Sequence, residues 1–392
     1  MSEFNLLDEK WIKVTTENGN KEVGLLELFE NAHKFTALDG ELPTQNFAVL
    51  RLLLAIMYAA LYKNVESYDE AVDLWFDIYK RGHFDYPVIR DYLEKFRDRF
   101  YLFDEKYPFY QIPESEAKLC GVGRLVGDLN ESDNKLSVFG AYGGEGKEKI
   151  AYAEAVRWLL HLMIYDIGSY GRDSKLYGYN GLTWAGKLGG VYIESFNLFD
   201  TLIKNYVTAD IDKAEPWKLG KPTWEMPLRK EIGVKLNVPP ESPVELLTGQ
   251  ERKIKLEQKS GFVTGVRVYG GYWFNSENYF DIEQMTLWFE NKKKETKQVY
   301  PKRHDVTKMI WHGLESIIAP IDSSIMIGIL KWNKFLIDKN LLCDYQVKIN
   351  AVGAKYKSAM NSAIDDFYSD SISFDVKILT ETDSNSIIYA NV

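Results

Sequence analysis

A glycine-rich stretch between residues 167 and 190 combines residue types that suit contact with a polyanion. It reads IGSYGRDSKLYGYNGLTWAGKLGG and places Arg172 and Lys175 among its glycines. Glycine lacks a Cβ, so the backbone there approaches another polymer closely and readily adopts positive φ. Backbone amides next to cationic side chains form an anion-binding surface. The other interpretation is a surface loop whose aromatic residues anchor it to the core, and the residue pattern leaves both open.

A second candidate for phosphate contact is the lysine cluster Lys292, Lys293 and Lys294. It lies in NKKKETK, directly after the apolar residues MTLWF at 285–289, and this pattern predicts a hairpin tip or a loop. Lysine ammonium groups bind phosphate and donate hydrogen bonds in DNA grooves. Most charge runs are solvated faces instead, so the sequence alone does not separate the two interpretations.

The pair His304-Asp305 has the residue types of a metal site. An HD-type phosphohydrolase needs such a pair together with a distant His and Asp on facing helices. Because the pair follows Pro301 and precedes a predicted helix, we interpret Asp305 as a helix cap and keep the metal-dependent phosphohydrolase as an alternative. The sequence contains no P-loop, nucleophile elbow, HExxH or paired CxxC. We therefore predict a non-catalytic protein with no cofactor and no bound metal.

Composition predicts a folded protein of the cytoplasm. Its 392 residues are 45% hydrophobic and 27% charged, which supports a large core and argues against disorder. Cys120 and Cys343 match no metal or redox spacing and are expected to be buried thiols in a reducing compartment. The N-terminus MSEFNLLDEKW is not a signal peptide. The longest apolar run, 47–62, is interrupted by Arg51 and is too short to span a membrane.

The net charge of -9 argues against a protein that binds nucleic acid on its own. Phosphate contact depends on the charges nearest the polymer, so a local basic patch is compatible with an acidic chain. Such a protein would touch DNA locally if other subunits supplied most of the affinity.

The hydrophobic pattern predicts an α+β fold in which strands and helices mix without regular βαβ alternation. Hairpins are expected around Asn18-Gly19 and Ser260-Gly261, and single strands at 191–193 and 345–352. Thr44 is expected to cap a long core helix, and Ser67 with Glu70 to form a capping box. The predicted helices cover residues 25–33, 45–63, 68–82, 87–97, 149–165, 198–207, 305–318 and 323–338.

We assign residues 1–368 to one α+β domain. Half of the prolines lie between Pro216 and Pro243, so a connector or extended surface segment is expected within about 210–243. Residues 369–392 are expected to be a C-terminal extension or the start of a linker.

Several long stretches resemble one family, the CasA large subunit of the type I-E CRISPR surveillance complex Cascade. The similar segments run in order over nearly the whole chain, from residue 4 to about residue 368. They are FNLLDEKWIKV (4–14), ELPTQNFAVLRLLLAI (41–56), RFYLFDEKYPFYQIP (99–113), AVRWLLHLMIYD (155–166), GKLGGVYIESFNLFDTLIKN (186–205) and YPKRHDVTKMIWHGLESI (300–317).

The resemblance implies a non-enzymatic DNA reader. In such complexes the guide RNA reads sequence by base pairing, while the protein reads a short adjacent motif in the duplex and helps to start unwinding. The implied partners are double-stranded target DNA, the other Cascade subunits, the guide RNA and a helicase–nuclease. No membrane partner is implied. A structural adaptor without DNA contact is a second alternative.

Carried over by position, the family's glycine loop falls within 168–181, with Gly168 and Gly171 as its contact positions. Glycines there would let the backbone lie against the minor groove. The family's lysine finger falls in the cluster at 292–294, with Lys292 or Lys293 favoured. The sequence SVFGAYGGEGK at 137–147 is similar to the family's flexible loop near the motif, with Phe139 at its aromatic position.

The family's glutamine-bearing wedge falls at 356–361, and this chain has no glutamine there. Asn361 would supply an amide, and Met360 an apolar group that unstacks a base step. The family normally continues into a C-terminal helical bundle, which this sequence does not contain. We therefore expect the contacts made by that bundle to be missing.

Overall fold

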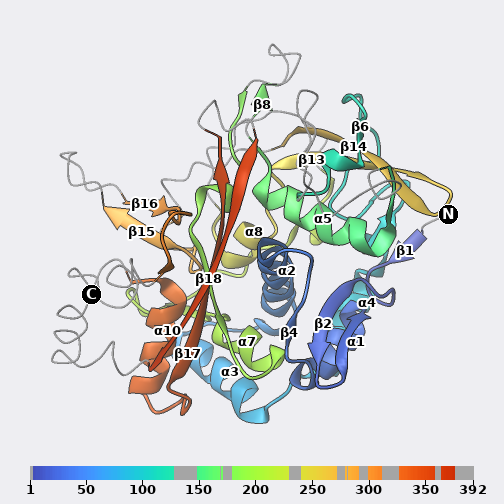
Figure 1. Ribbon diagram of the computed structural model, residues 1–392. Coiled ribbons are helices and arrows are strands. Elements are labelled where there is room, and N and C mark those ends of the chain that lie inside the picture. The colour runs from blue at the N-terminus through green and yellow to red at the C-terminus, as the bar shows by residue number, and fades with distance from the viewer. Residues whose placement is uncertain are drawn as a thin grey trace.

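The computed structural model describes residues 3–127, 148–167, 169–170, 179–228, 240–271, 279, 281–290, 299–310, 326–357 and 363–375, with the backbone alone at 169–170, 179–180 and 290. Helices and several small sheets are mixed along the chain, which confirms the predicted α+β class (Figure 1). The α-helices are α1 (Leu25–Asn31), α2 (Pro43–Leu61), α3 (Tyr68–Arg81), α4 (Tyr86–Lys95), α5 (Tyr152–Tyr165), α7 (Leu198–Lys204), α8 (Pro243–Leu247) and α10 (Gly328–Asp338).

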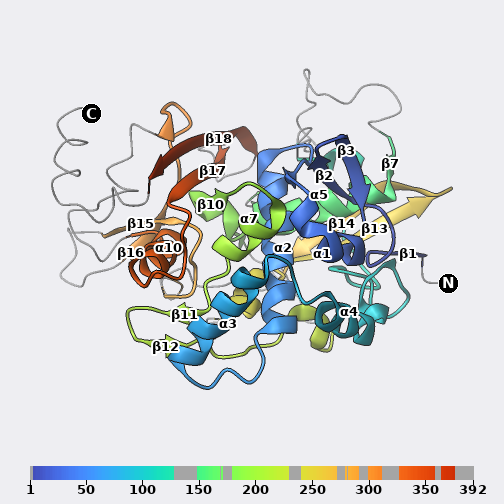
Figure 2. The ribbon, with the colours of Figure 1, turned by 90° about the horizontal axis from the view of Figure 1, so that it is seen from below.

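Helix α2 lies at the centre of the molecule, where Figures 1 and 2 both show it surrounded by other elements. Apolar residues occupy nearly every face of α2, and almost all of its side chains are buried. Among the described helices, α2 alone has the length and apolar composition of a membrane-crossing helix, and 89% of that stretch is buried inside the protein. A helix that is apolar all round is typical of a protein core.

The strands form small antiparallel sheets around this core. Two sheets have three strands, one has four, and the others are two-stranded ribbons. The strands are β1 (Glu3–Asn5) with β5 (Tyr101–Phe103); β2 (Ile12–Thr16), β3 (Gly19–Val23) and β4 (Ala37–Leu38); β6 (Cys120–Gly121), β7 (Ile150–Ala151), β13 (Arg252–Lys259) and β14 (Phe262–Gly270); β8 (Ser169–Tyr170) with β9 (Tyr179–Asn180); β10 (Gly190–Glu194), β17 (Gln346–Tyr356) and β18 (Ile364–Asp375); β11 (Ala209–Asp210) with β12 (Glu215–Pro216); and β15 (Leu287–Glu290) with β16 (Val299–Lys302).

The longest ribbon is the hairpin of β17 and β18, which runs diagonally to the left of α2 in Figure 1. Its register runs from Gln346 opposite Asp375 to Tyr356 opposite Ile364, with an irregularity between Lys355 and Tyr356. Strand β10 pairs along the other edge of β17. This sheet carries the chain from the core to residues 358–362, which lie outside the described residues.

Several predictions from short-range signals are confirmed. The hairpin β2–β3 turns at Asn18-Gly19, with Gly19 at φ 108°, and β13–β14 turns at Ser260-Gly261, with both residues at positive φ. Ser67 accepts a hydrogen bond from the Glu70 amide, and the Glu70 side chain accepts one from the Ser67 amide, so the capping box is complete. Helix α3 then ends at Gly82 in the left-handed conformation, as glycine allows.

Two predicted helix caps are wrong. Helix α2 begins at Pro43 after Leu42, with no side-chain cap, because proline needs no amide partner in the first turn. The Thr44 hydroxyl instead lies 3.0 Å from Nε2 of buried His161. Asp305 does not begin a helix: residues 305–309 form a turn in which its carboxylate accepts hydrogen bonds from the amide and hydroxyl of Thr307. Residues 311–318 lie outside the described residues.

The structure also corrects two other expectations and adds one strand that the sequence did not indicate. Cys343 is exposed and Cys120 is half-buried, so neither is a core thiol. The proline-rich segment contains packed elements, since Pro243 begins α8 against α2 and Trp224 is buried in a short 3-10 helix (Thr223–Glu225). Strand β18 was not predicted at all, because its alternation of Asp and Ser with apolar residues resembles a solvated loop until β17 pairs with it.

Candidate nucleic-acid interface

The ten residues that the sequence singled out for DNA contact all lie outside the residues that the structure describes. They are Phe139, Gly168, Gly171, Arg172, Lys175, Lys292, Lys293, Lys294, Met360 and Asn361. Their own positions therefore remain predictions. The described residues that flank them show where each segment leaves the protein core and what holds it there.

The glycine-rich segment leaves the core at the end of α5. Strands β8 and β9 pair near its two ends, with Ser169 opposite Asn180. We call Asp166, Ile167 and Gly181 the loop neck, because they precede and follow residues 168–180. One guanidinium, that of Arg252, binds all three: Nε donates to Asp166 Oδ2 at 2.5 Å, and Nη2 donates to the carbonyl oxygens of Ile167 at 3.1 Å and Gly181 at 2.7 Å.

The neck is an ion cluster with more positive than negative charge. The buried carboxylate of Asp166 lies between Arg252 and Arg124, whose Nη2 donates to Oδ1 at 2.5 Å. Burial alone would raise the pKa of Asp166, but the charges and hydrogen bonds of the two guanidinium groups hold it below its ordinary value. Asp166 therefore stays ionised at neutral pH, and both arginines keep their partner.

The lysine cluster lies in the segment that joins β15 to β16. The beginning of this hairpin is attached to Gly189: the Leu287 amide donates to the Gly189 carbonyl at 3.3 Å, and the Thr286 hydroxyl does so at 3.1 Å. A Cβ at Gly189 would collide with the carbonyl oxygen of Lys302 on the returning strand. Glycine is therefore required here for close backbone approach.

His304 anchors the chain just after β16. Its Nε2 donates to the carbonyl oxygen of Gly190 at 2.9 Å, and its ring stacks on Tyr368 of β18. Burial lowers the pKa of His304 to about 4, so the ring is neutral and holds its proton on Nε2. Asp305 faces Thr307 and Lys308 instead. No group of three metal-ligating side chains occurs in the described parts of the chain, so nothing there favours the phosphohydrolase alternative.

The wedge is expected at 356–361, but its first position, Tyr356, is the buried last residue of β17, so only the residues after it lie beyond the strand. The Tyr356 hydroxyl donates to the carbonyl oxygen of Tyr165 at 3.0 Å, directly before the loop neck. The guanidinium of Arg303 lies over the Tyr356 ring, 5.8 Å from its centroid. The Lys357 amide donates to the Ala363 carbonyl at 3.0 Å, which closes the backbone on both sides of residues 358–362.

Tyr356 thus connects the starting points of three segments that are distant in sequence. Its contacts reach Tyr165 before the glycine-rich segment and Arg303 after the lysine hairpin, while the wedge follows Tyr356 itself. Gly186 packs so closely that a Cβ there would collide with the Tyr356 hydroxyl. The fold therefore brings together the bases of all three predicted contact segments.

A fourth segment, 128–147, contains Phe139 and starts near the same helix. Gly127 lies against the ring of His161 on α5, where a Cβ would be 2.7 Å from Cε1. Arg124, three residues earlier, is the second partner of Asp166. The residues that lead into this segment therefore also lie beside α5 and the loop neck.

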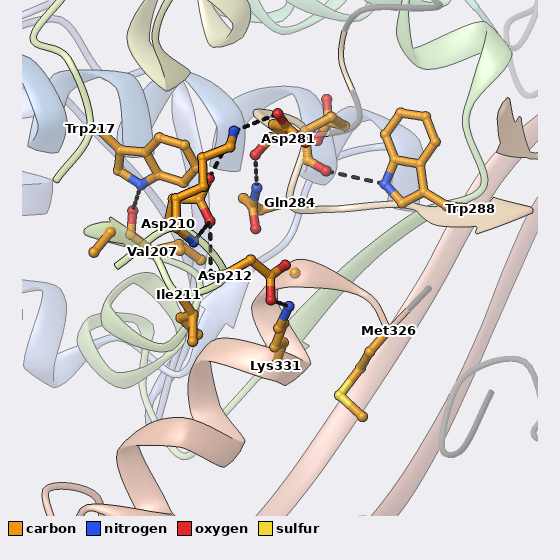
Figure 3. A pocket seen from close by; sticks show the side chains of 14 residues that line it. Val207, Asp210, Ile211, Asp212, Trp217, Asp281, Gln284, Trp288, Met326 and Lys331 are labelled. Atoms are coloured by element: carbon orange, nitrogen blue, oxygen red, sulfur yellow. Dashed lines mark hydrogen bonds and ion pairs between the residues drawn. The ribbon is translucent and has the colours of Figure 1, made fainter. Parts of the chain in front are cut away.

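A nearby pocket has a different character. It is a cavity of about 70 Å³. Figure 3 shows that Trp217, Asp281 and Lys331 line it, together with Asp210 and Asp212. Its lysines are already paired: Lys213 binds Asp281 at 2.5 Å, and Lys331 binds Asp212. A pocket for a small molecule is usually several times larger, and an acidic wall repels phosphate. This pocket is not part of the interface.

Sequence reasoning missed the residues that hold the bases of the predicted contact segments. Arg252 and Tyr356 resemble ordinary strand residues, and only the fold shows what they bind. Arg51 carried a signal, because it interrupts the most apolar run of the chain. It forms a buried two-point ion pair with Glu283, at 3.0 and 2.9 Å. Glu283 also accepts from Trp184 Nε1 at 2.6 Å and so ties the segment after the loop neck to α2.

Comparison with known proteins agrees with the resemblance seen in the motifs. Residues 5–390 match the family described as CRISPR-associated protein Cse1. A 161-residue segment, 41% of this chain, is 35% identical to CasA/Cse1 of Thermus thermophilus, and this match spans only 31% of that curated relative's length.

Solved structures show the same fold. Cse1 of Thermobifida fusca superposes with a TM-score of 0.85 and 28% identity, over 98% of this chain and 77% of that one. Cse1 of Acidimicrobium ferrooxidans gives 0.81 at 23% identity, over 98% and 74%. A chain of a CRISPR RNA-guided surveillance complex shares the fold at 0.73 and 16% identity, over 98% and 78%. The chain belongs to the CRISPR-associated Cse1 family, the CasA large-subunit family of Cascade that its motifs resemble.

Proposed function

We propose that this protein is a non-catalytic, cytoplasmic subunit of a type I-E CRISPR complex and reads the motif next to the target in double-stranded DNA. In this role it assembles with guide RNA and other Cascade subunits, helps to start unwinding and supports recruitment of a helicase–nuclease. The observation that carries the proposal is the convergence at Tyr356. Glycine-rich, lysine-rich and wedge segments, each suited to one kind of DNA contact, start from one contact cluster.

The physical roles of these segments follow from their residue types. Gly168 and Gly171 would bring backbone amides close to the minor groove, where a side chain would strike the sugar walls. Lys292 and Lys293 would neutralise phosphates or donate to base edges. Met360 and Asn361 would enter the base stack at the point where unwinding starts. A chain of net charge -9 needs the rest of the complex for tight binding.

The test is target-duplex binding by guide-loaded complex, with and without this protein, on matched and scrambled adjacent motifs. We expect the protein to raise affinity on the matched motif only. The double variant Lys292→Glu/Lys293→Glu should weaken binding and lower the slope of log affinity against log salt by about two, one for each lost phosphate contact.

The matched control is Lys10→Glu/Lys259→Glu, which makes the same charge change at two exposed lysines elsewhere on the protein. It should retain motif choice and nearly the full salt slope. If the protein joins the complex but binding ignores the motif, the DNA-reading role is wrong and the adaptor role replaces it.

A further inference from the structure

The guanidinium of Arg252 occupies an unusual position at the loop neck. Arg252 is the first residue of β13, and its side chain is only 3% exposed. Its Nε holds Asp166, and its Nη2 holds the carbonyl oxygens on both sides of residues 168–180. Its Nη1 donates to the Glu251 carbonyl at 3.0 Å, which fixes the guanidinium to its own backbone.

Only arginine provides this set of contacts. The guanidinium is planar and rigid, and its five N–H groups point in fixed, diverging directions. Lysine places one compact charge at the end of a flexible stem and cannot hold a carboxylate and two separated carbonyl groups in one geometry. Buried carbonyl groups that lose their donor are costly, so the neck has a strong preference for this closed arrangement.

The closed neck fixes the two residues that flank positions 168–180. The carbonyl oxygens of Ile167 and Gly181 are held by the same nitrogen atom, so these two residues stay close together and keep one relative orientation. The pairing of Ser169 with Asn180 continues from this fixed base. Thr183 adds to the closure, because its amide donates to the Asp166 carbonyl at 3.4 Å.

We propose that Arg252 is a positioning residue for motif recognition: it touches no DNA, and it sets the register in which the glycine-rich segment meets the duplex. This inference rests on the proposed function and adds a residue to it. Glycine residues have no side chains that could adjust to compensate for a shift of the loop neck. Discrimination between motifs therefore depends on how firmly the neck is held.

The first experiment does not depend on DNA. Hydrogen–deuterium exchange of the isolated protein compares wild type, Arg252→Lys and Arg267→Lys. Arg267 is the matched control, because on neighbouring β14 it also joins a carboxylate, Glu257, to a carbonyl, that of Ala117. Arg252→Lys should accelerate exchange in peptides covering 168–181 by roughly tenfold, the ratio that corresponds to one charge-assisted hydrogen bond. Arg267→Lys should leave those peptides at wild-type rates.

The second experiment measures motif discrimination in the guide-loaded complex. Arg252→Lys should lower the ratio of matched to scrambled affinity, while complex assembly and the salt slope stay near wild type, because no phosphate-binding charge is removed. A purely structural role would weaken assembly and both affinities alike. Unchanged exchange at 168–181, or acceleration spread over the whole protein, overturns the inference even if wild type reads the motif.

The two proposals fail in different ways. If wild type shows no motif dependence while Arg252→Lys still accelerates exchange at 168–181 alone, the neck is real and the DNA-reading function is wrong. Should Arg252→Lys fail to fold, Asp166→Asn replaces it. The side-chain amide oxygen of that variant would still accept from Arg252 Nε but would lack the negative charge, so we expect a smaller acceleration of exchange, confined to the same peptides. If Asp166→Asn does not accelerate exchange there, the inference is overturned as well.

Discussion

Single side chains at the base of the interface each join segments that are distant in sequence. Arg252 joins the two ends of the glycine-rich segment, and Tyr356 joins the wedge to the end of α5. Both are buried, so their polar groups must find partners inside the protein. Their partners include carbonyl oxygens next to the predicted contact segments. The same buried hydrogen bonds therefore also fix the points from which these segments start.

Tyr356→Phe tests the hydrogen bond to Tyr165. The variant keeps the ring and loses only the hydroxyl, which leaves a buried carbonyl without this donor. We expect the free energy of unfolding to fall by about 1 kcal/mol, measured by urea denaturation.

Tyr165→Phe is the matched control for that variant, because the buried Tyr165 hydroxyl finds no partner among the residues that the structure describes. Its removal should change stability by about 0.5 kcal/mol or less. Equal losses in the two variants would show that the Tyr356 hydrogen bond adds nothing specific.

At the scale of elements, short hairpins lead to the predicted contact segments, and longer elements hold those hairpins. Strand β17 pairs with β10 on one edge along 348–352 and with β18 on the other edge along its whole length, so the predicted wedge follows a strand end that β18 holds. The lysine hairpin rests on Gly189 and Gly190, at the start of β10. Helix α3 reaches this sheet through α7: Trp75 donates to the Ile203 carbonyl of α7 at 2.8 Å, and α7 packs against β10.

The capping box at Ser67 and Glu70 is expected to stabilise helix α3. Ser67→Ala removes the acceptor for the Glu70 amide and should lower the free energy of unfolding by about 1 kcal/mol. Ser67→Asp retains a carboxylate oxygen at the same place and should stay near wild type. Thermal unfolding followed by circular dichroism compares the two, and equal loss in both would mean that the cap contributes little.

At the scale of the whole molecule, buried polar groups connect the central helix α2 to its surroundings. Arg51 binds Glu283, and Thr44 meets His161 of α5. The ring of His161 is fully enclosed, and burial lowers its pKa to about 3. The folded protein therefore resists protonation at a site where the unfolded chain accepts a proton readily.

This difference predicts acid sensitivity. The folded pKa of His161 lies below its ordinary value of 6.5, so its contribution is present above that value and is lost as the pH falls toward about 3. Between about pH 7 and about pH 5, wild type should lose about 2 kcal/mol of unfolding free energy through this group. Denaturation at both pH values measures the loss.

His161→Gln isolates this group. His304, whose pKa burial lowers to about 4, contributes in the same direction in both proteins, so the difference between them belongs to His161. Glu41 adds little in this window: burial opposes its ionisation, but hydrogen bonds from Arg157 and Lys13 bring its pKa to about 2. If wild type and His161→Gln lose the same unfolding free energy between these two pH values, His161 does not cause the acid sensitivity.

Short-range sequence signals determined several turns and helices of this protein. The turns at Asn18-Gly19 and Ser260-Gly261, the capping box at Ser67 and the apolar helix α2 depend on neighbouring residues only, and each is found where the sequence places it. The family was also readable, because long motifs recur in order along the chain and the match over residues 5–390 confirms it.

Other features depended on residues far away. Whether Thr44 capped a helix or met His161 depended on a partner 117 residues later. Strand β18 needed β17, and Arg252 acquired its role only when the fold brought Asp166 and Gly181 to it. The residue types of the contact segments are properties of the sequence. That three of these segments leave the core around Tyr356 is a property of the tertiary structure, because long-range packing alone sets which distant carbonyl groups meet which donors.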